Sequence, residues 1–92
     1  MNKELTGMNE NEKRVAALIE HLSAEGYATI QERDDMLDVL KWDGVFAPLT
    51  GVTAVVANDN KPLTQELLDE VIALKDIYDE EYYEELMESQ GL

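Results

Sequence analysis

Carboxylates are the residues of this chain with the clearest potential for chemistry. The 92 residues include 21 Asp and Glu against 7 Lys and Arg, which gives a formal net charge of −14. Ten of the acids lie between Glu66 and Glu88, and Lys75 is the only base from residue 62 onward. Carboxylates accept strong, charge-assisted hydrogen bonds from Lys and Arg. This concentration of acids therefore points to recognition of a basic surface on another protein.

The spacing of these acids strengthens that interpretation. Carboxylates repeat at i, i+4, as in Glu66–Glu70 and Glu80–Glu84, and each such pair costs a helix a few tenths of a kcal/mol. On one continuous helix the ten acids would be spaced at about one per 3.3 Å, close to the phosphate spacing of about 3.4 Å along one DNA strand. We predict a DNA-like face that binds a partner. Its residues are Glu66, Asp69, Glu70, Asp76, Glu80, Glu81, Glu84, Glu85, Glu88 and the aromatic Tyr83. The alternative is a solvated face that only maintains solubility.

A second group of candidate contacts lies near the middle of the chain. We predict a secondary partner-binding set of Asp34, Asp35, Asp38 and Trp42. Trp42 and Phe46 flank the dipeptide Asp43-Gly44, and they either cover the core or, if exposed, form an interface hot spot. Tyr78 and Tyr82 are expected to complete an apolar stripe, with Tyr83 at its edge.

Other site chemistry finds little support. Cysteine is absent, so thiolate sites are excluded. His21 is the only histidine. His21 is within reach of Glu25 at i+4, and we interpret it as a partly exposed structural residue. The chain has no P-loop, no G-x-G-x-x-G, no H-E-x-x-H and no nucleophile elbow. We therefore expect no catalytic residues, no metal, no cofactor and no enzymatic activity.

Two helices are predicted in the first half of the chain. Apolar residues at Val15, Leu18, Ile19 and Leu22 follow helical spacing over about 11–25, with Asn9 or Asn11 as the N-cap. The sequence Thr29-Ile30-Gln31-Glu32 fits a capping box that opens a second helix ending near residue 42. The pair resembles the first half of a helix-turn-helix, but acids occupy the second helix where bases would be needed to meet DNA phosphates. Direct nucleic-acid binding is not expected.

The segment 45–57 has a different composition. It is rich in β-branched residues and is interrupted by Pro48 and Gly51, so we predict a short β element with a strand over 52–57. An alternative is a hairpin over 39–47, with Asp43-Gly44 at its turn. A purely helical fold is the alternative for the whole chain.

The last predicted element is a long amphipathic acidic helix from Pro62 to about Ser89. It would be roughly 40 Å long, against a diameter of roughly 32 Å for a domain of this size. The helix must therefore overhang, bend or end early, and an overhanging end could pair with a second chain. Its apolar stripe is formed by Leu67, Val71, Leu74, Tyr78 and Tyr82.

Together these patterns predict one small domain over 1–92, of α+β class and mainly helical, with residues 1–8 flexible. The predicted function is a non-enzymatic inhibitor that blocks a nucleic-acid-binding host protein of restriction, CRISPR or transcription machinery, by analogy of composition with small acidic phage proteins. The alternative is a structural or regulatory module that homodimerises through the long helix. We expect the partner to be a basic or nucleic-acid-binding protein. Membrane binding is not expected, because the acidic surface repels anionic lipid. The expected location is the cytoplasm, of the host if phage-encoded.

Overall fold

The computed structural model describes residues 9–59 and 62–92, and within those ranges it contains helices and no strands. The elements in chain order are α2 (Glu10–Ala24), α3 (Ile30–Asp43), α4 (Phe46–Asp59), α5 (Gln65–Ala73), the 3-10 helix η1 (Lys75–Ile77) and α6 (Glu80–Ser89). Each of the five α-helices contributes buried residues to one hydrophobic core. The fold is therefore all-α, which was the alternative to the predicted α+β class. The flexibility predicted for residues 1–8 lies outside the described residues.

The two N-terminal helices agree with their prediction. Asn9 caps α2: its side chain accepts the Glu12 amide at 2.8 Å, and the Glu12 carboxylate accepts the Asn9 amide at 3.1 Å. Thr29 and Glu32 form the same reciprocal capping box at the start of α3. Such boxes satisfy backbone donors that a helix start otherwise leaves without partners. Local sequence is thus sufficient to begin both helices.

The predicted hairpin over 39–47 is wrong. Residues up to Asp43 continue α3, and Gly44 ends that helix with a φ of 84°. The left-handed region that this φ occupies carries little cost for glycine because it has no Cβ. The Asp43-Gly44 dipeptide therefore marks a helix end and not a turn between strands.

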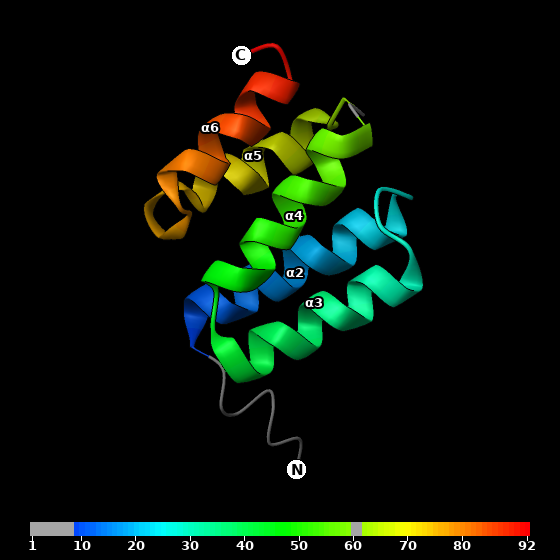
Figure 1. Ribbon diagram of the computed structural model, residues 1–92, viewed down its shortest axis with the longest axis vertical. Coiled ribbons are helices and arrows are strands. Elements are labelled where there is room, and N and C mark those ends of the chain that lie inside the picture. The colour runs from blue at the N-terminus through cyan, green and yellow to red at the C-terminus, as the bar shows by residue number, and fades with distance from the viewer. Residues whose placement is uncertain (1–8, 60–61) are drawn as a thin grey trace.

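The predicted β element over 45–57 is also wrong, because the same residues form α4. Leu49, Val52, Thr53 and Val56 are all buried, and their spacing of i, i+3, i+4 and i+7 is that of one helical face. In Figure 1, α4 crosses the middle of the molecule, where it packs against α3, α6 and α2. Burial on several sides explains the apolar, β-branched composition, since tertiary packing overrides intrinsic propensity.

Gly51 lies where α4 contacts α3. A Cβ at this position would lie 3.2 Å from Cγ and Sδ of Met36, so the methionine side chain would have to shift by a few tenths of an ångström. The glycine that seemed to interrupt a strand thus lies at a close contact between two helices.

The predicted long C-terminal helix is wrong as well. The chain leaves α5 at Ala73, passes through η1, and starts α6 at Glu80. Asp79 caps the new helix by accepting the amides of Glu81 at 3.0 Å and Tyr82 at 3.4 Å. The break lets α5 pack on α2 and α6 pack on α4 (Figure 1), whereas one straight helix would carry part of its apolar stripe past the core.

Tyr78 fixes the position of this break. Its hydroxyl donates to the Leu49 carbonyl at 2.9 Å and lies 2.6 Å from Oγ1 of Thr53, which also reaches the Tyr82 carbonyl at 3.1 Å. Burial raises the pKa of the Tyr78 phenol, so the group is neutral and available as a donor. The turn between α5 and α6 is therefore tied to the central helix.

The apolar stripe of the predicted long helix is used inside the chain. Leu67, Val71, Leu74 and Tyr78 are at most 6% exposed and belong to the core. Tyr82, the last residue of the stripe, is 38% exposed. Homodimerisation of the chain stays a prediction. No helix among the described residues is long and apolar enough to cross a bilayer.

Candidate functional site

Helix α6 presents the densest group of exposed carboxylates. Leu86 points into the core and is fully buried, while the acids of the remaining faces are exposed. These acids are Glu80, Glu81, Glu84, Glu85 and Glu88. We call them the α6 acidic surface. Within residues 9–59 and 62–92, none of the five takes part in an ion pair.

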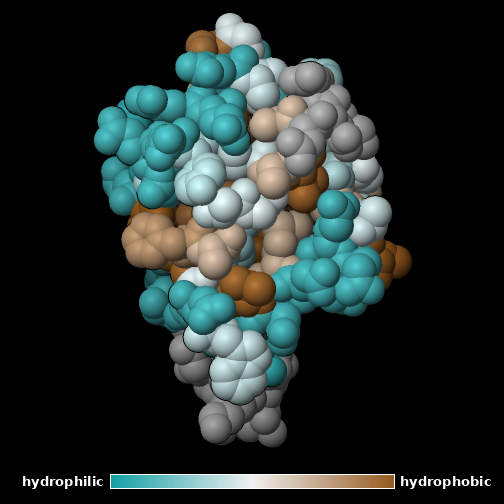
Figure 2. Space-filling view, viewed as in Figure 1, coloured by the Kyte–Doolittle hydropathy of each residue, from teal (hydrophilic) through white to brown (hydrophobic). Residues whose placement is uncertain are grey.

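A second acidic region lies on α3. Asp34, Asp35 and Asp38 are exposed there. Arg33 pairs with Asp34 at 2.9 Å, and the Gln31 amide donates to Asp35 at 3.0 Å. In Figure 2, hydrophilic side chains gather over α6 at the upper left and over α3 at the right, with a paler band over α4 between them. One face of the molecule thus presents hydrophilic side chains of both α6 and α3.

Trp42 and Phe46 are on the surface and not in the core. Trp42 is 73% exposed and Phe46 is 64% exposed. Lys41 places its Nζ 5.5 Å from the Trp42 ring centroid, within the range of a cation–π contact. The structure therefore excludes a core position for both side chains, and their role as an interface hot spot stays a prediction.

The tyrosines agree with the prediction in part, since Tyr78 is buried in the apolar stripe and Tyr83 packs at its edge. Tyr83, a predicted partner contact, is half-buried and meets Tyr78 edge to face with ring centroids 5.7 Å apart. Lys75 Nζ lies 5.8 Å from the Tyr83 ring. Tyr82, predicted to complete the apolar stripe, is 38% exposed. Of Tyr78, Tyr82 and Tyr83, Tyr82 is thus the most accessible to solvent.

The acids of α5 are separated from the α6 acidic surface by the break at residues 74–79. Asp69 is exposed and accepts the Gln65 amide at 2.8 Å, and Asp76 is exposed on η1. Glu66 and Glu70 lie on α5 beside α2, whereas α6 packs against α4. The single linear array of ten carboxylates therefore does not form, because it required one unbroken helix.

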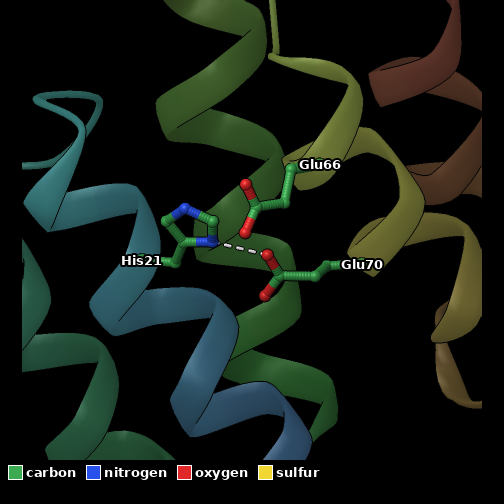
Figure 3. A group of neighbouring side chains, drawn as sticks. All are labelled: His21, Glu66 and Glu70. Atoms are coloured by element: carbon green, nitrogen blue, oxygen red, sulfur yellow. Dashed lines mark hydrogen bonds and ion pairs between the residues drawn. The ribbon is translucent and has the colours of Figure 1, made fainter.

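Glu66 and Glu70 meet His21 in a cluster that sequence analysis missed (Figure 3). Oε2 of Glu70 lies 2.5 Å from Nδ1 of His21, and Oε2 of Glu25 lies 3.6 Å from Nε2. The hydrogen bond with Glu70 raises the pKa of His21, and partial burial opposes this rise. The charges of Glu70, Glu66 and Glu25 add to the rise in pKa.

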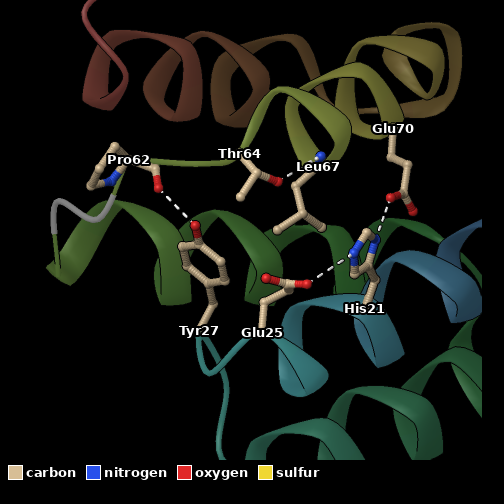
Figure 4. Close-up of polar contacts among 7 residues, drawn as sticks. All are labelled: His21, Glu25, Tyr27, Pro62, Thr64, Leu67 and Glu70. Carbon is tan, nitrogen blue, oxygen red and sulfur yellow. Dashed lines mark hydrogen bonds and ion pairs between the residues drawn. The ribbon is translucent and has the colours of Figure 1, made fainter.

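Two contacts shown in Figure 4 join the segment around α5 to the N-terminal part of the chain. Tyr27 donates its hydroxyl to the Pro62 carbonyl at 2.7 Å, and Glu70 of α5 meets His21 of α2. Thr64 caps α5 itself by accepting the Leu67 amide at 3.2 Å. The sequence signal for the cluster was two acid-containing pairs at i, i+4, His21–Glu25 and Glu66–Glu70. Nothing in the sequence brings two such pairs together across more than 40 residues.

No protein-family model, curated protein or solved structure matches this chain. The chemistry of the exposed carboxylates and aromatic side chains is therefore the basis for a functional proposal.

Proposed function

We propose that this protein is a non-enzymatic, phage-type inhibitor whose acidic surface occupies the basic nucleic-acid-binding surface of a host protein. The observation that supports the proposal is the α6 acidic surface, whose five carboxylates are exposed and without ion-pair partners among the described residues. Restriction, CRISPR and transcription proteins carry basic surfaces of the required kind. The feature that would resemble DNA is the local density of negative charge on α6. It is not a linear array of ten carboxylates along one helix.

The energetics favour a basic partner. Like charges at i, i+4 on α6, such as Glu80–Glu84 and Glu84–Glu88, oppose the helix by a few tenths of a kcal/mol each. A partner that supplies Lys and Arg would relieve this repulsion and form charge-assisted hydrogen bonds. Among the described residues, these carboxylates have no ion pair that would have to break first. Complementary charge would also accelerate association, with a strong dependence on ionic strength.

The exposed aromatic residues complement this charge. Interface energy concentrates in a few large side chains, among which Trp is enriched. Trp42 lies at the end of α3, close in sequence to the secondary acidic set of Asp34, Asp35 and Asp38. We propose that α6 supplies electrostatic attraction and that Trp42 supplies an apolar anchor.

The direct test is capture of a partner from a bacterial lysate by the immobilised protein. At low salt we expect a basic nucleic-acid-binding protein to be retained, and at about 0.5 M salt we expect it to be released, because screening shortens the range of exposed charges. Added double-stranded DNA should compete with the captured protein. Retention that is insensitive to both salt and DNA would contradict the proposal.

A further inference from the structure

The cluster between α2 and α5 combines one imidazole with two carboxylates. His21 comes from α2, and Glu66 and Glu70 come from successive turns of α5. One ligand atom from each residue lies within 4.8 Å of the other two, and Figure 3 shows the three side chains converging between the helices. Imidazole nitrogen and carboxylate oxygen are both common ligands of divalent transition metals.

We propose that His21, Glu66 and Glu70 bind one divalent transition-metal ion of the Zn²⁺ class between α2 and α5. The site is independent of the α6 acidic surface and of the function proposed for it. Three protein ligands would leave a fourth position of a tetrahedral ion to water. The ion would join two helices that are far apart in sequence, so binding would stabilise the fold.

The observed separations suit this ion after small side-chain adjustments. Zn²⁺ binds His nitrogen and carboxylate oxygen at about 2.0–2.2 Å, so ligand atoms around a tetrahedral ion lie about 3.3 Å apart. The present separations, from 2.5 Å for the His21–Glu70 pair up to a limit of 4.8 Å, bracket that value. Glu66 is exposed and Glu70 is half-buried, so both side chains have room to rotate.

Glu25 provides the outer partner that such a histidine needs. When Nδ1 of His21 binds the metal, its Nε2 carries the proton and faces the Glu25 carboxylate at 3.6 Å. Metal-bound histidines usually donate their second N–H to a carboxylate or carbonyl, which fixes the tautomer and raises the basicity of the ligand. The arrangement around His21 therefore extends beyond the three ligands.

The local charge also favours a cation. Glu25, Glu66 and Glu70 surround a single imidazole, and in the described part of the chain none of them pairs with Lys or Arg. Arg14, which lines a hollow together with Glu70, donates instead to the Ala73 carbonyl and to Asn11. The nitrogen ligand distinguishes this site from the remaining acidic surface, where Mg²⁺ and Ca²⁺ would bind only through oxygen.

The test is calorimetric titration of tag-free, chelator-treated protein with ZnCl₂ in the presence of excess Mg²⁺. We expect one Zn²⁺ per chain and a higher unfolding temperature with Zn²⁺. His21→Gln and Glu66→Gln should each weaken binding at least about tenfold. Glu20→Gln is the matched control, because Glu20 is exposed on α2 next to His21 but outside the cluster. Binding that is equally strong in His21→Gln, or equally weakened in Glu20→Gln, would overturn the proposal.

A spectroscopic measurement on the unmodified chain removes any effect of the substitutions on folding. Because His21 is the only histidine, its ring gives a single set of NMR signals. One equivalent of ZnCl₂ should shift the ring ¹⁵N and ¹³C signals until the site is saturated. Ring signals that do not move while Zn²⁺ binds would show that the ion is bound by other carboxylates, and the proposal would be wrong.

Discussion

Of the contacts that His21 makes, only the local one could be predicted from the sequence. The sequence predicts its neighbour Glu25, because residues at i and i+4 share a helical face, and the structure confirms that contact at 3.6 Å. Its stronger partner, Glu70, is 49 residues away. That contact depends on how α5 packs against α2, and local periodicity carries no information about it. The same limitation explains why Glu66 and Glu70 were predicted on a face with the α6 acids.

His21 should make stability depend on pH in protein kept free of divalent ions by a chelator. Its pKa is raised in the folded protein, mainly by the hydrogen bond with Glu70. A raised pKa means that the folded state binds the proton more tightly than the unfolded state. The contribution to stability is therefore complete below the unfolded pKa of about 6.5, and it is lost as the pH rises through the folded pKa.

Urea unfolding measured from pH 6 to pH 9 would check this prediction. We expect the free energy of unfolding to fall across that range in the natural chain and to fall less in His21→Gln. A variant with the same pH dependence as the natural chain would show that the slope has another origin.

At the scale of elements, the predictions succeeded where local sequence determines the outcome and failed where packing does. Asn9, one of the two N-caps predicted for the first helix, begins α2, and the predicted capping box at Thr29 begins α3. Each satisfies backbone donors within four residues. Segment 45–57 has strand-like composition, yet Leu49, Val52, Thr53 and Val56 are buried as one helical face. Tertiary burial thus outweighed β propensity. The helical spacing was present in the sequence but was obscured by β-branched residues.

Between α5 and α6, the sequence predicted one continuous helix where the chain in fact breaks. No glycine or proline lies between residues 63 and 89, so the usual signals of a helix end are missing. The break instead follows from the buried hydrogen bonds of Tyr78 and from Asp79 as the N-cap of α6. An Asp within an acidic run resembles its neighbours, and only the structure identifies it as a cap.

The capping role of Asp79 can be tested with a matched pair of substitutions. Asp79→Ala removes the acceptor for the amides of Glu81 and Tyr82, and we expect it to destabilise the protein by about 1 kcal/mol. Asp76→Ala removes the same charge from an exposed position on η1, and we expect a change within about 0.5 kcal/mol. Urea unfolding measures both. Equal effects of the two substitutions would contradict the capping role and attribute the change to net charge.

At the scale of the whole molecule, the break in the last helix changes how the net charge of −14 is arranged. Part of the acidic excess lies beside His21 on α5, and part forms the exposed α6 acidic surface. Helix α3, which carries the secondary set, lies on the face that also presents α6 (Figure 2). Most of the predicted acids are therefore exposed, while their arrangement in separate groups required the three-dimensional fold.

We propose that the α6 acidic surface, and not net charge alone, binds a basic protein. The variant Glu84→Lys/Glu85→Lys/Glu88→Lys reverses three of its exposed carboxylates, and lysines in the last turns of a helix complement its dipole, so the fold should persist. The variant Glu10→Lys/Glu20→Lys/Asp43→Lys reverses three exposed acids elsewhere and changes the net charge by the same amount.

The most direct measurement compares these two variants with the natural chain in capture of protein from a bacterial lysate at low salt. Circular dichroism first verifies that each variant retains its helical content. We expect that reversal on α6 abolishes retention of the basic partner and that the control substitutions leave most of it. Equal retention by both variants, or equal loss in both, would contradict a binding role specific to α6.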